Sequence, residues 1–434
     1  MPVTRRNFLQ GSATVAAAPS MSFAANDRIQ VGIIGAGARS QELMAGLMTL
    51  PGAEIVGVVD AYTGRVERTR ERVGQKVKPY ASHKEMIADK SIDAVVIVTP
   101  DHWHKEMVIE AVRNGKDVYC EKPLTYRSAE GMEIVRAAAE AKRIVQVGSQ
   151  LVSTEAQRKA REMIAAGRLG QVTMIRAAYN RNTASGAWIY PIPPDASPRT
   201  VNWDAFLGPA PKRDFSLERF FRWRCYDDYS GGIATDLFVH LCTSIHFMMK
   251  ATAPSRVMAM GQLYRWKESR EVPDTMNALL EYPEGFAVNL SSTFNNELSG
   301  GSSFQILGTE GALTLGNGLT FHPDRTREDN RWIVESWPQR LEREYYQDPK
   351  VRAAEVPAAW RPKLDQGLER WEEVGGDMTA AHLSVWLDSI RTRKAPYEDA
   401  ITGHRAAACA HMVNQSVKQK RQVEWDFGKD DIRA

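Results

Sequence analysis

Two side chains capable of acid–base chemistry stand four residues apart in an apolar segment. Asp236 and His240 follow the pair Gly231-Gly232, and apolar residues recur around them at helical spacing. Side chains at i and i+4 share one helix face, so we expect carboxylate and imidazole to be neighbours. The carboxylate would then stabilise the protonated imidazole and move its pKa into a range useful for proton transfer. His240 is the candidate base and Asp236 its orienting partner or a hydroxyl ligand. The alternative is a helix-capping Asp beside a structural His.

A glycine-rich turn offers a second kind of chemistry. The β-rich run 28–34 leads into Gly35-Ala36-Gly37-Ala38-Arg39, a helical pattern follows, and a second apolar strand ends at Asp60. This order is typical of a dinucleotide-binding βαβ unit. Gly35 permits the turn, Gly37 lets the backbone approach a pyrophosphate, and the helix N-terminus offers N–H groups. Asp60 would bind the ribose 2′-hydroxyl and repel a 2′-phosphate, which favours NAD over NADP. The alternative is an ordinary turn and a solvent-facing acid.

Three more strands extend this unit. The apolar runs 93–98, 117–120 and 144–148 alternate with helical patterns, which predicts a parallel sheet whose ligands lie at the carboxyl ends of its strands. Thr99-Pro100 and Glu121-Lys122 follow two of these strands directly. We expect both pairs at the cofactor, with Lys122 polarising the reacting oxygen.

Other polar residues have less specific interpretations. His102 and His104 have no Cys or acid at metal-ligand spacing, so we expect no metal site; His104 is assigned instead to the nicotinamide half of the cofactor. Trp223 and Arg224 suit sugar recognition by stacking and hydrogen bonding, or they brace two domains. His382 is placed either in the cleft or in the core.

Composition narrows the class of protein. The chain has 434 residues, 56 Lys+Arg against 53 Asp+Glu, a net charge of +3 and 43% hydrophobic residues. The small net charge argues against a nucleic-acid-binding protein, and the hydrophobic fraction argues against a disordered chain. No uncharged apolar run is long enough to span a bilayer, and four Cys make no disulfide framework. We therefore expect a soluble multi-domain α/β enzyme.

The N-terminus has the pattern of an export signal. Arg5-Arg6-Asn7-Phe8-Leu9 precedes a weakly apolar stretch, and Ser22-Phe23-Ala24 offers small residues for signal peptidase. This arrangement resembles a twin-arginine signal, so residues 1–24 are assigned to a signal peptide handled by the twin-arginine export machinery, and the protein to the periplasm or another extracytoplasmic space. The alternative is an uncleaved tail.

The rest of the chain predicts two domains. Residues 28–150 form the NAD-binding domain. Residues 151–427 contain period-two runs at 172–179, 256–263, 275–282, 287–293, 303–307, 313–315 and 422–426, which predict a mixed, largely antiparallel sheet. Helices are expected at 382–393 and 404–418, a long ordered loop at 190–211, and a charge-rich insertion at 324–375.

These motifs together resemble the Gfo/Idh/MocA oxidoreductases. The resemblance rests on the glycine turn, Thr99-Pro100 with His104, Glu121-Lys122-Pro123, and the segment 230–240. It implies a Rossmann domain that binds NAD(P), a second α+β domain with an open sheet, and a homo-oligomer, either a dimer or a tetramer. It also implies that Lys122 contacts nicotinamide and substrate, that Asp236 and His240 complete the catalytic site, and that the Lys122–Pro123 bond is cis.

The resemblance and the export signal suggest one activity. Free NAD is scarce outside the cytoplasm, so we expect an oxidoreductase that keeps and recycles its cofactor while acting on a secondary hydroxyl of a sugar, sugar derivative or cyclitol. One alternative is a glycosidase or lyase that works by transient oxidation, elimination and re-reduction. Another is a cofactor-stabilised binding protein without turnover.

Overall fold

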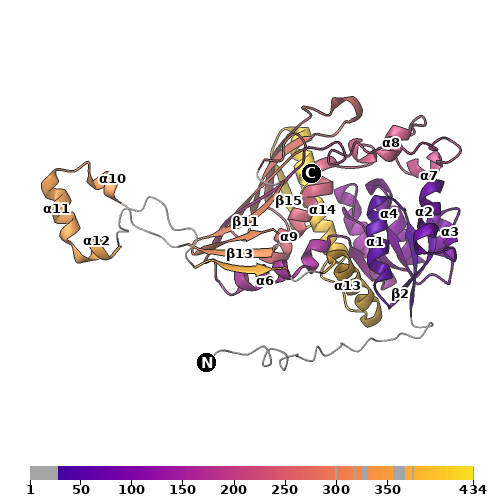
Figure 1. The fold of residues 1–434 in the computed structure, drawn as a ribbon, viewed down its shortest axis with the longest axis horizontal. Coiled ribbons are helices and arrows are strands. Elements are labelled where there is room, and N and C mark those ends of the chain that lie inside the picture. Colours follow the sequence, from indigo (N-terminus) through magenta and orange to yellow (C-terminus); the bar gives the residue numbers. More distant parts are fainter. Residues whose placement is uncertain are drawn as a thin grey trace, which may run out of the picture.

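The computed structural model describes residues 28–298, 301–316, 318–324, 330–354, 367–373 and 376–433. The predicted signal, residues 1–24, lies outside these ranges. Figure 1 shows a first domain of α/β layers, a second domain built on a broad sheet, and a small helical lobe set apart from both. The predicted fold class, a Rossmann domain followed by an α+β domain with a large, mostly antiparallel sheet, is confirmed.

The first domain is built on a six-stranded parallel sheet in the order β3-β2-β1-β4-β5-β6. Its strands are β1 (Ile29–Ile34), β2 (Ala53–Val59), β3 (Lys78–Pro79), β4 (Ala94–Ile97), β5 (Asp117–Cys120) and β6 (Val145–Val147). Its helices are α1 (Ala38–Met48), α2 (Thr63–Val73), α3 (His83–Ala88), α4 (His104–Arg113) and α5 (Gly131–Ala141). The strand order reverses between β1 and β4, and open α/β sheets bind ligands at such a reversal.

The second domain is built on a ten-stranded sheet in the order β14-β13-β12-β11-β7-β10-β9-β8-β15-β16. Its strands are β7 (Val172–Asn180), β8 (Arg256–Gln262), β9 (Thr275–Tyr282), β10 (Phe286–Thr293), β11 (Ser302–Gly308), β12 (Gly311–Leu315), β13 (Gly318–Pro323), β14 (Glu369–Glu372), β15 (Val423–Asp426) and β16 (Asp431–Ile432). Only β7 and β10 pair in parallel; the other pairs are antiparallel.

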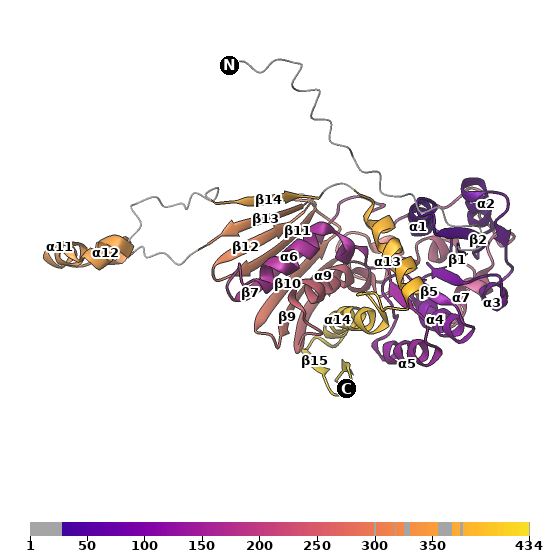
Figure 2. The same ribbon diagram turned by 90° about the horizontal axis from the view of Figure 1, so that it is seen from below.

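Helices cover one face of this large sheet. They include α6 (Glu155–Ala165), α9 (Val239–Met249) and α14 (Ala400–Gln419), of which α14 lies between the sheet and the first domain in Figure 2. The strands alternate accordingly: in β9 every second residue is buried. Period two with one covered face is the pattern that the sequence predicted.

The second half of the chain also completes the first domain. Helix α13 (Met378–Thr392) follows strand β14 of the large sheet in sequence, yet its buried Leu383, Trp386 and Leu387 pack into the same core as α1. The other face of the parallel sheet packs against α3, α4 and α5. The two domains are therefore tied together by the core and not by a linker alone.

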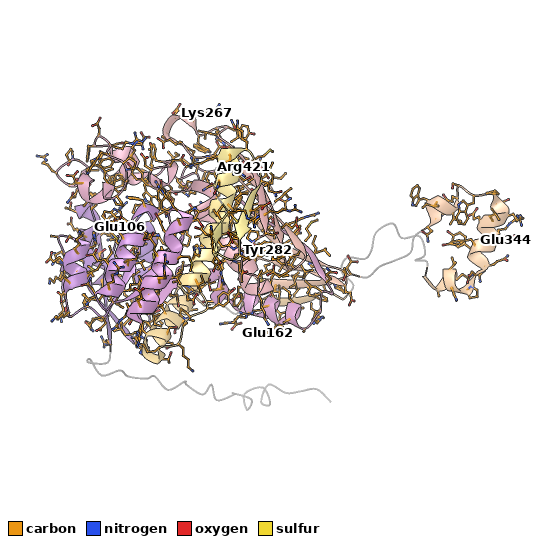
Figure 3. All side chains as sticks on the ribbon, turned by 180° about the vertical axis from the view of Figure 1, so that it is seen from behind. Glu106, Glu162, Lys267, Tyr282, Glu344 and Arg421 are labelled. Carbon is orange, nitrogen blue, oxygen red and sulfur yellow. The ribbon has the colours of Figure 1, made fainter. Side chains whose placement is uncertain are left out.

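The predicted insertion contains both a lobe and a strand. Helices α10 (Arg331–Val334), α11 (Gln339–Gln347) and α12 (Pro349–Ala354) form the lobe, on which Glu344 is marked in Figure 3 well apart from Tyr282 of the sheet domain. Strand β14, however, pairs with β13 at the edge of the sheet. Among the described residues, no helix combines the length and apolarity needed to cross a membrane.

Candidate active site

A cavity of about 660 Å³ lies where the two domains meet. The first domain contributes the loops after β1, β2, β4 and β5, including Gly35, Asp60, Thr99 and Lys122. The second contributes side chains from distant segments; the most important are Arg181, Trp188, Tyr190, Asn202, Phe206, Phe221, Trp223, Arg224, Asp236 and His240. The sequence predicted the main polar residues of the first wall and a smaller part of the second.

The glycine turn is shaped for a phosphate group. Gly35 has φ +88°, and a Cβ there would lie 2.7 Å from the carbonyl oxygen of Val98, so only glycine fits. A Cβ on Gly37 would meet nothing nearer than 3.8 Å, so the space above it is open to the cavity. Gly37 caps α1 without a side-chain bond, which leaves the helix N–H groups available to an anion. These residues fit the pyrophosphate of a dinucleotide.

Asp60 is anchored beside this turn. One carboxylate oxygen accepts a hydrogen bond from the backbone N–H of Ala36 (2.7 Å), and the other accepts from the N–H of Tyr62 (2.8 Å). Arg65 approaches the same carboxylate at 3.5 Å. Asp60 also lines the cavity, so its position is compatible with the predicted contact with a ribose hydroxyl, which stays a prediction.

Arg39 and Glu121 form an ion pair across the mouth of the turn. The guanidinium Nε of Arg39 donates to Glu121 at 2.8 Å, and Glu121 is only 5% exposed. Both line the cavity, as do Ala38, Thr99 and Pro100, whereas Ala36 is not part of its wall. The pair ties the start of α1 to the end of β5 and thereby fixes Lys122.

Lys122 and Asp236 join the two domains at the other end of the cavity. The Lys122 ammonium donates to the Asp236 carboxylate at 2.9 Å and to its backbone carbonyl at 2.8 Å. Arg224 donates from Nε to the same carboxylate oxygen at 3.0 Å. The Lys122–Pro123 bond is cis, as the resemblance implied. His240 lines the cavity beside these groups.

Asp236 sits in a π-helical turn that the sequence did not reveal. Residues Ala234–Phe238 are π-helical and run directly into α9. Such turns often occur at functional sites. A spacing of four residues looks the same in an α-helix and in this turn, so the periodicity could not distinguish them.

Burial and the charges around Lys122 and Asp236 determine the pKa of His240, and that pKa differs from the predicted one. Burial raises the pKa of Asp236, but Lys122 and Arg224 outweigh it and hold that pKa well below its ordinary value. Burial, and next the charge of Lys122, lowers the pKa of His240 to about 3, although Asp236 acts in the opposite direction. Asp236 therefore favours the protonated imidazole as predicted, but burial and the charge of Lys122 outweigh it, and the prediction that the pKa of His240 lies in a range useful for proton transfer is wrong. His240 is a neutral imidazole near pH 7.

His104 lies behind the cavity wall instead of in it. Its Nδ1 is 2.6 Å from the carbonyl oxygen of Pro123 and its Nε2 is 3.0 Å from that of Thr99. The ring is 1% exposed and is not among the residues that line the cavity. His104 thus links the loops after β4 and β5, and any effect on the cofactor passes through them. His382 is also a core residue, bonded to Ser153 and the carbonyl of Val147.

Several wall residues were missed from the sequence. Asp101, Arg181, Trp188 and Tyr190 all line the cavity. Burial raises the pKa of Asp101 to about 7, although Lys122 acts against that rise. Asp101 follows Thr99-Pro100 directly, but the sequence does not reveal that its carboxyl group is buried. No local pattern distinguishes Arg181 from a surface arginine. No group of three or more metal-ligating side chains occurs within the described ranges.

The two glycines of the turn give a matched prediction. Gly35→Ala is expected to lower the free energy of unfolding by about 1–3 kcal/mol, since alanine is strained at positive φ and meets the Val98 carbonyl. Gly37→Ala should leave stability nearly unchanged and weaken NAD binding, because its methyl group points into open space. Urea denaturation and NAD titration measure the two effects. Equal destabilisation by both substitutions would contradict this account of the turn.

Comparison with known proteins identifies the class to which this fold and site belong. Residues 29–149 match the model of the oxidoreductase family with an NAD-binding Rossmann fold, and residues 161–425 match that family's C-terminal alpha/beta domain. The chain belongs to the Gfo/Idh/MocA oxidoreductase family.

Individual relatives are more distant. The chain is 27% identical over 299 residues to 1,5-anhydro-D-fructose reductase of Ensifer adhaerens, covering 67% of this chain and 77% of that protein. It is 33% identical over 160 residues to inositol 2-dehydrogenase of Burkholderia cenocepacia, covering 36% of this chain and only about half (47%) of that protein. A levoglucosan dehydrogenase structure with NADH and levoglucosan superimposes with a TM-score of 0.67 at 17% identity, covering 92% of this chain and 99% of the other. That last likeness concerns the fold.

Proposed function

We propose that this protein is an NAD-dependent oxidoreductase that acts on a secondary hydroxyl of a sugar, sugar derivative or cyclitol. The observation that carries the proposal is the meeting of Lys122, Asp236 and His240, from two domains, in one cavity with the glycine turn. The names of the relatives, a reductase of anhydrofructose and dehydrogenases of inositol, support this class of substrate.

The residues have distinct parts in this proposal. NAD, when bound, supplies the hydride acceptor. Neutral His240 has a free lone pair and accepts the hydroxyl proton as general base. The Lys122 ammonium, held by two oxygens of Asp236, polarises the reacting oxygen. Asp236 positions Lys122 and Arg224, so its effect passes through those two cations.

A panel of sugars and cyclitols tests the activity. Protein without residues 1–24 is mixed with NAD and each compound, and absorbance of the reduced nicotinamide is followed while products are identified by mass spectrometry. A keto product from at least one compound is expected. Cleaved or dehydrated products would instead indicate a glycosidase or lyase. Binding of a compound without any product would contradict the proposal that the protein is an enzyme.

We further propose that the cofactor stays bound between turnovers. Residues 189–221, here called the strap, cross from the second domain onto the first and form part of the cavity wall. The N–H of Asn202 donates to the carbonyl of Ala61 at 2.7 Å, and the N–H of Thr63 donates to that of Thr200 at 3.0 Å. The Tyr62 hydroxyl donates to Asp195 at 2.5 Å.

The strap makes a second set of contacts with the first domain. The Trp103 indole donates to the carbonyl oxygen of Phe206 at 2.9 Å, and His102 lies 3.0 Å from the same oxygen. The Arg65 guanidinium lies over the rings of Phe220 and Phe221. Release of a dinucleotide would have to break several of these contacts together, which supports retention.

The strap gives a kinetic prediction. Tyr62→Phe and Asp195→Ala are each expected to speed NAD release about five- to tenfold, the effect of losing one hydrogen bond of about 1–1.5 kcal/mol. The double variant should be no faster than either single one, since both remove the same contact. Tyr264→Phe, at an exposed tyrosine, is the control. Stopped-flow displacement measures the rates, and additive effects would contradict the pairing.

Retention fits our proposal that the protein is exported by the twin-arginine route to the periplasm or another extracytoplasmic space. Its support is the sequence Arg5-Arg6-Asn7-Phe8-Leu9, and that route carries folded proteins, so a cofactor loaded before export would stay inside. Arg5→Lys with Arg6→Lys should hold the protein in the cytoplasm in cell fractionation. Unchanged export would argue against this route.

We also propose a homo-oligomer formed through the uncovered face of the ten-stranded sheet. On that face Met258, Met260 and Leu279 are 49%, 73% and 61% exposed and lie on adjoining strands. Sedimentation should report a dimer or tetramer, and Met260→Glu should weaken it. A monomer at micromolar concentration would refute the proposal.

A further inference from the structure

Arg224 presents a fixed positive charge to the substrate end of the cavity. Its guanidinium lies 4.2 Å from the centre of the Trp223 ring, and its Nε is bonded to Asp236. Its two terminal nitrogens have no hydrogen-bond partner among the described residues. Trp223 therefore supports Arg224, and the ring face under the guanidinium is not free to stack on a sugar.

Arg181 adds a second positive charge from the end of β7. One terminal nitrogen donates to the carbonyl of Gly186 at 3.1 Å, and the guanidinium lies over the Phe294 ring at 5.8 Å. Both contacts hold the side chain in the cavity wall. Arg181, Arg224, Tyr190 and Asp236 all line the same cavity, so the two guanidinium groups border one space.

The charges at this end do not balance. Lys122, Arg181 and Arg224 face Asp236, which is ionised and already bonded to two of them. Asp101 is the second carboxyl group there, and even when it is ionised the three cations exceed the two carboxylates by one charge. A surplus of positive charge in a partly buried cavity is costly unless an anion shares it. A neutral sugar would leave that surplus in place.

We infer that the substrate carries an anionic group, a carboxylate or a sulfate or phosphate ester, and that Arg181 and Arg224 bind it. This inference rests on the proposed sugar oxidoreductase activity and names its substrate class. Arginine matches the planar, two-oxygen geometry of such anions, and its hydrogen bonds to them are stronger than those between neutral groups.

Binding to protein loaded with NADH tests the inference without turnover. Calorimetry compares glucose with glucuronate, galactose with galacturonate, and glucose with its 6-phosphate and 6-sulfate esters. In at least one pair the anion should bind about tenfold tighter or more, and the preferred pair identifies the kind of anion. Arg181→Met should lower that ratio severalfold, since only Arg224 then remains, and Arg181→Lys should keep more of it.

Arg340→Gln is the matched control. It removes one positive charge from the exposed face of α11 and should keep the full ratio. Equal affinity for both members of every pair, or a ratio unchanged by Arg181→Met, would overturn the inference. If neutral sugars still bind, the proposed function is not contradicted by that result. No binding by any compound would overturn both.

Discussion

Replacing Lys122 with methionine is expected to lower sugar-dependent turnover by a factor on the order of 10³, because one side chain both polarises the reacting oxygen and ties the domains at the site. The fold should survive, since Arg224 still compensates Asp236. Lys122→Arg should not restore activity: guanidinium geometry differs from that of a compact ammonium. Steady-state kinetics with the best sugar measures the loss.

The same substitution has a second, independent effect. The charge of Lys122 is, after burial, the largest cause that lowers the pKa of His240. Lys122→Met should therefore raise that pKa, and the chemical shifts of labelled histidine should report it. Lys105→Met is the control, since Lys105 lies on α4 in a surface pair with Glu133. Activity within tenfold of the native protein would contradict the assignment of Lys122.

Acid is expected to destabilise the protein strongly between pH 6.5 and pH 4. Burial lowers the pKa of His102, His382 and His411 to about 4, and that of His240 and His246 to about 3. Below pH 6.5 these histidines are protonated in the unfolded chain but stay neutral in the native protein, so the free energy of unfolding falls as the pH falls. Each histidine contributes about 2 kcal/mol of loss at pH 5.

Buried carboxyl groups, Asp101 and Glu398 among them, oppose this trend. Burial raises the pKa of Asp101 to about 7 and that of Glu398 well above its ordinary value, so both take up protons in the native state as pH falls. Their protonation offsets part of the loss of stability that the histidines cause at pH 5. Urea midpoints measured from pH 8 to pH 5 test this.

His246 allows the contribution of a single buried histidine to the pH dependence of stability to be measured. His246 lies 2.9 Å from the Tyr282 hydroxyl and is remote from the cavity wall. His246→Gln should keep a hydrogen bond to Tyr282 and reduce the slope of stability against pH by about 1.4 kcal/mol per unit, the value for one proton. Unchanged midpoints between pH 7.5 and pH 5 in the native protein would contradict the burial of neutral histidines.

Much of the first domain was predictable because its signals are local. Gly35, Gly37 and Asp60 stand at fixed offsets around strands that are buried on both faces, and the structure places them as the motif requires. Strand β14 was missed because it pairs at the sheet edge, where Glu369 and Glu372 tolerate solvent and give no apolar run.

The second wall of the site was harder to predict because it comes from distant segments. Arg181 and Tyr190 reach the cavity only after β7 is placed in the sheet, and Asp236 is compensated by Lys122 from 114 positions away. The sequence put Asp236 and His240 on one face correctly, but their electrostatic relation depends on cations that spacing does not reveal.

The most direct test of the account is the nicotinamide content of the protein itself. The mature protein is purified without added nucleotide, a portion is denatured, and released nicotinamide is quantified; another portion is first exposed, in its native state, to sugars and uronic acids. We expect about one nicotinamide cofactor per chain, converted to its reduced form by at least one compound and still bound after gel filtration. An empty protein that needs millimolar NAD for any activity would contradict a retained and recycled cofactor.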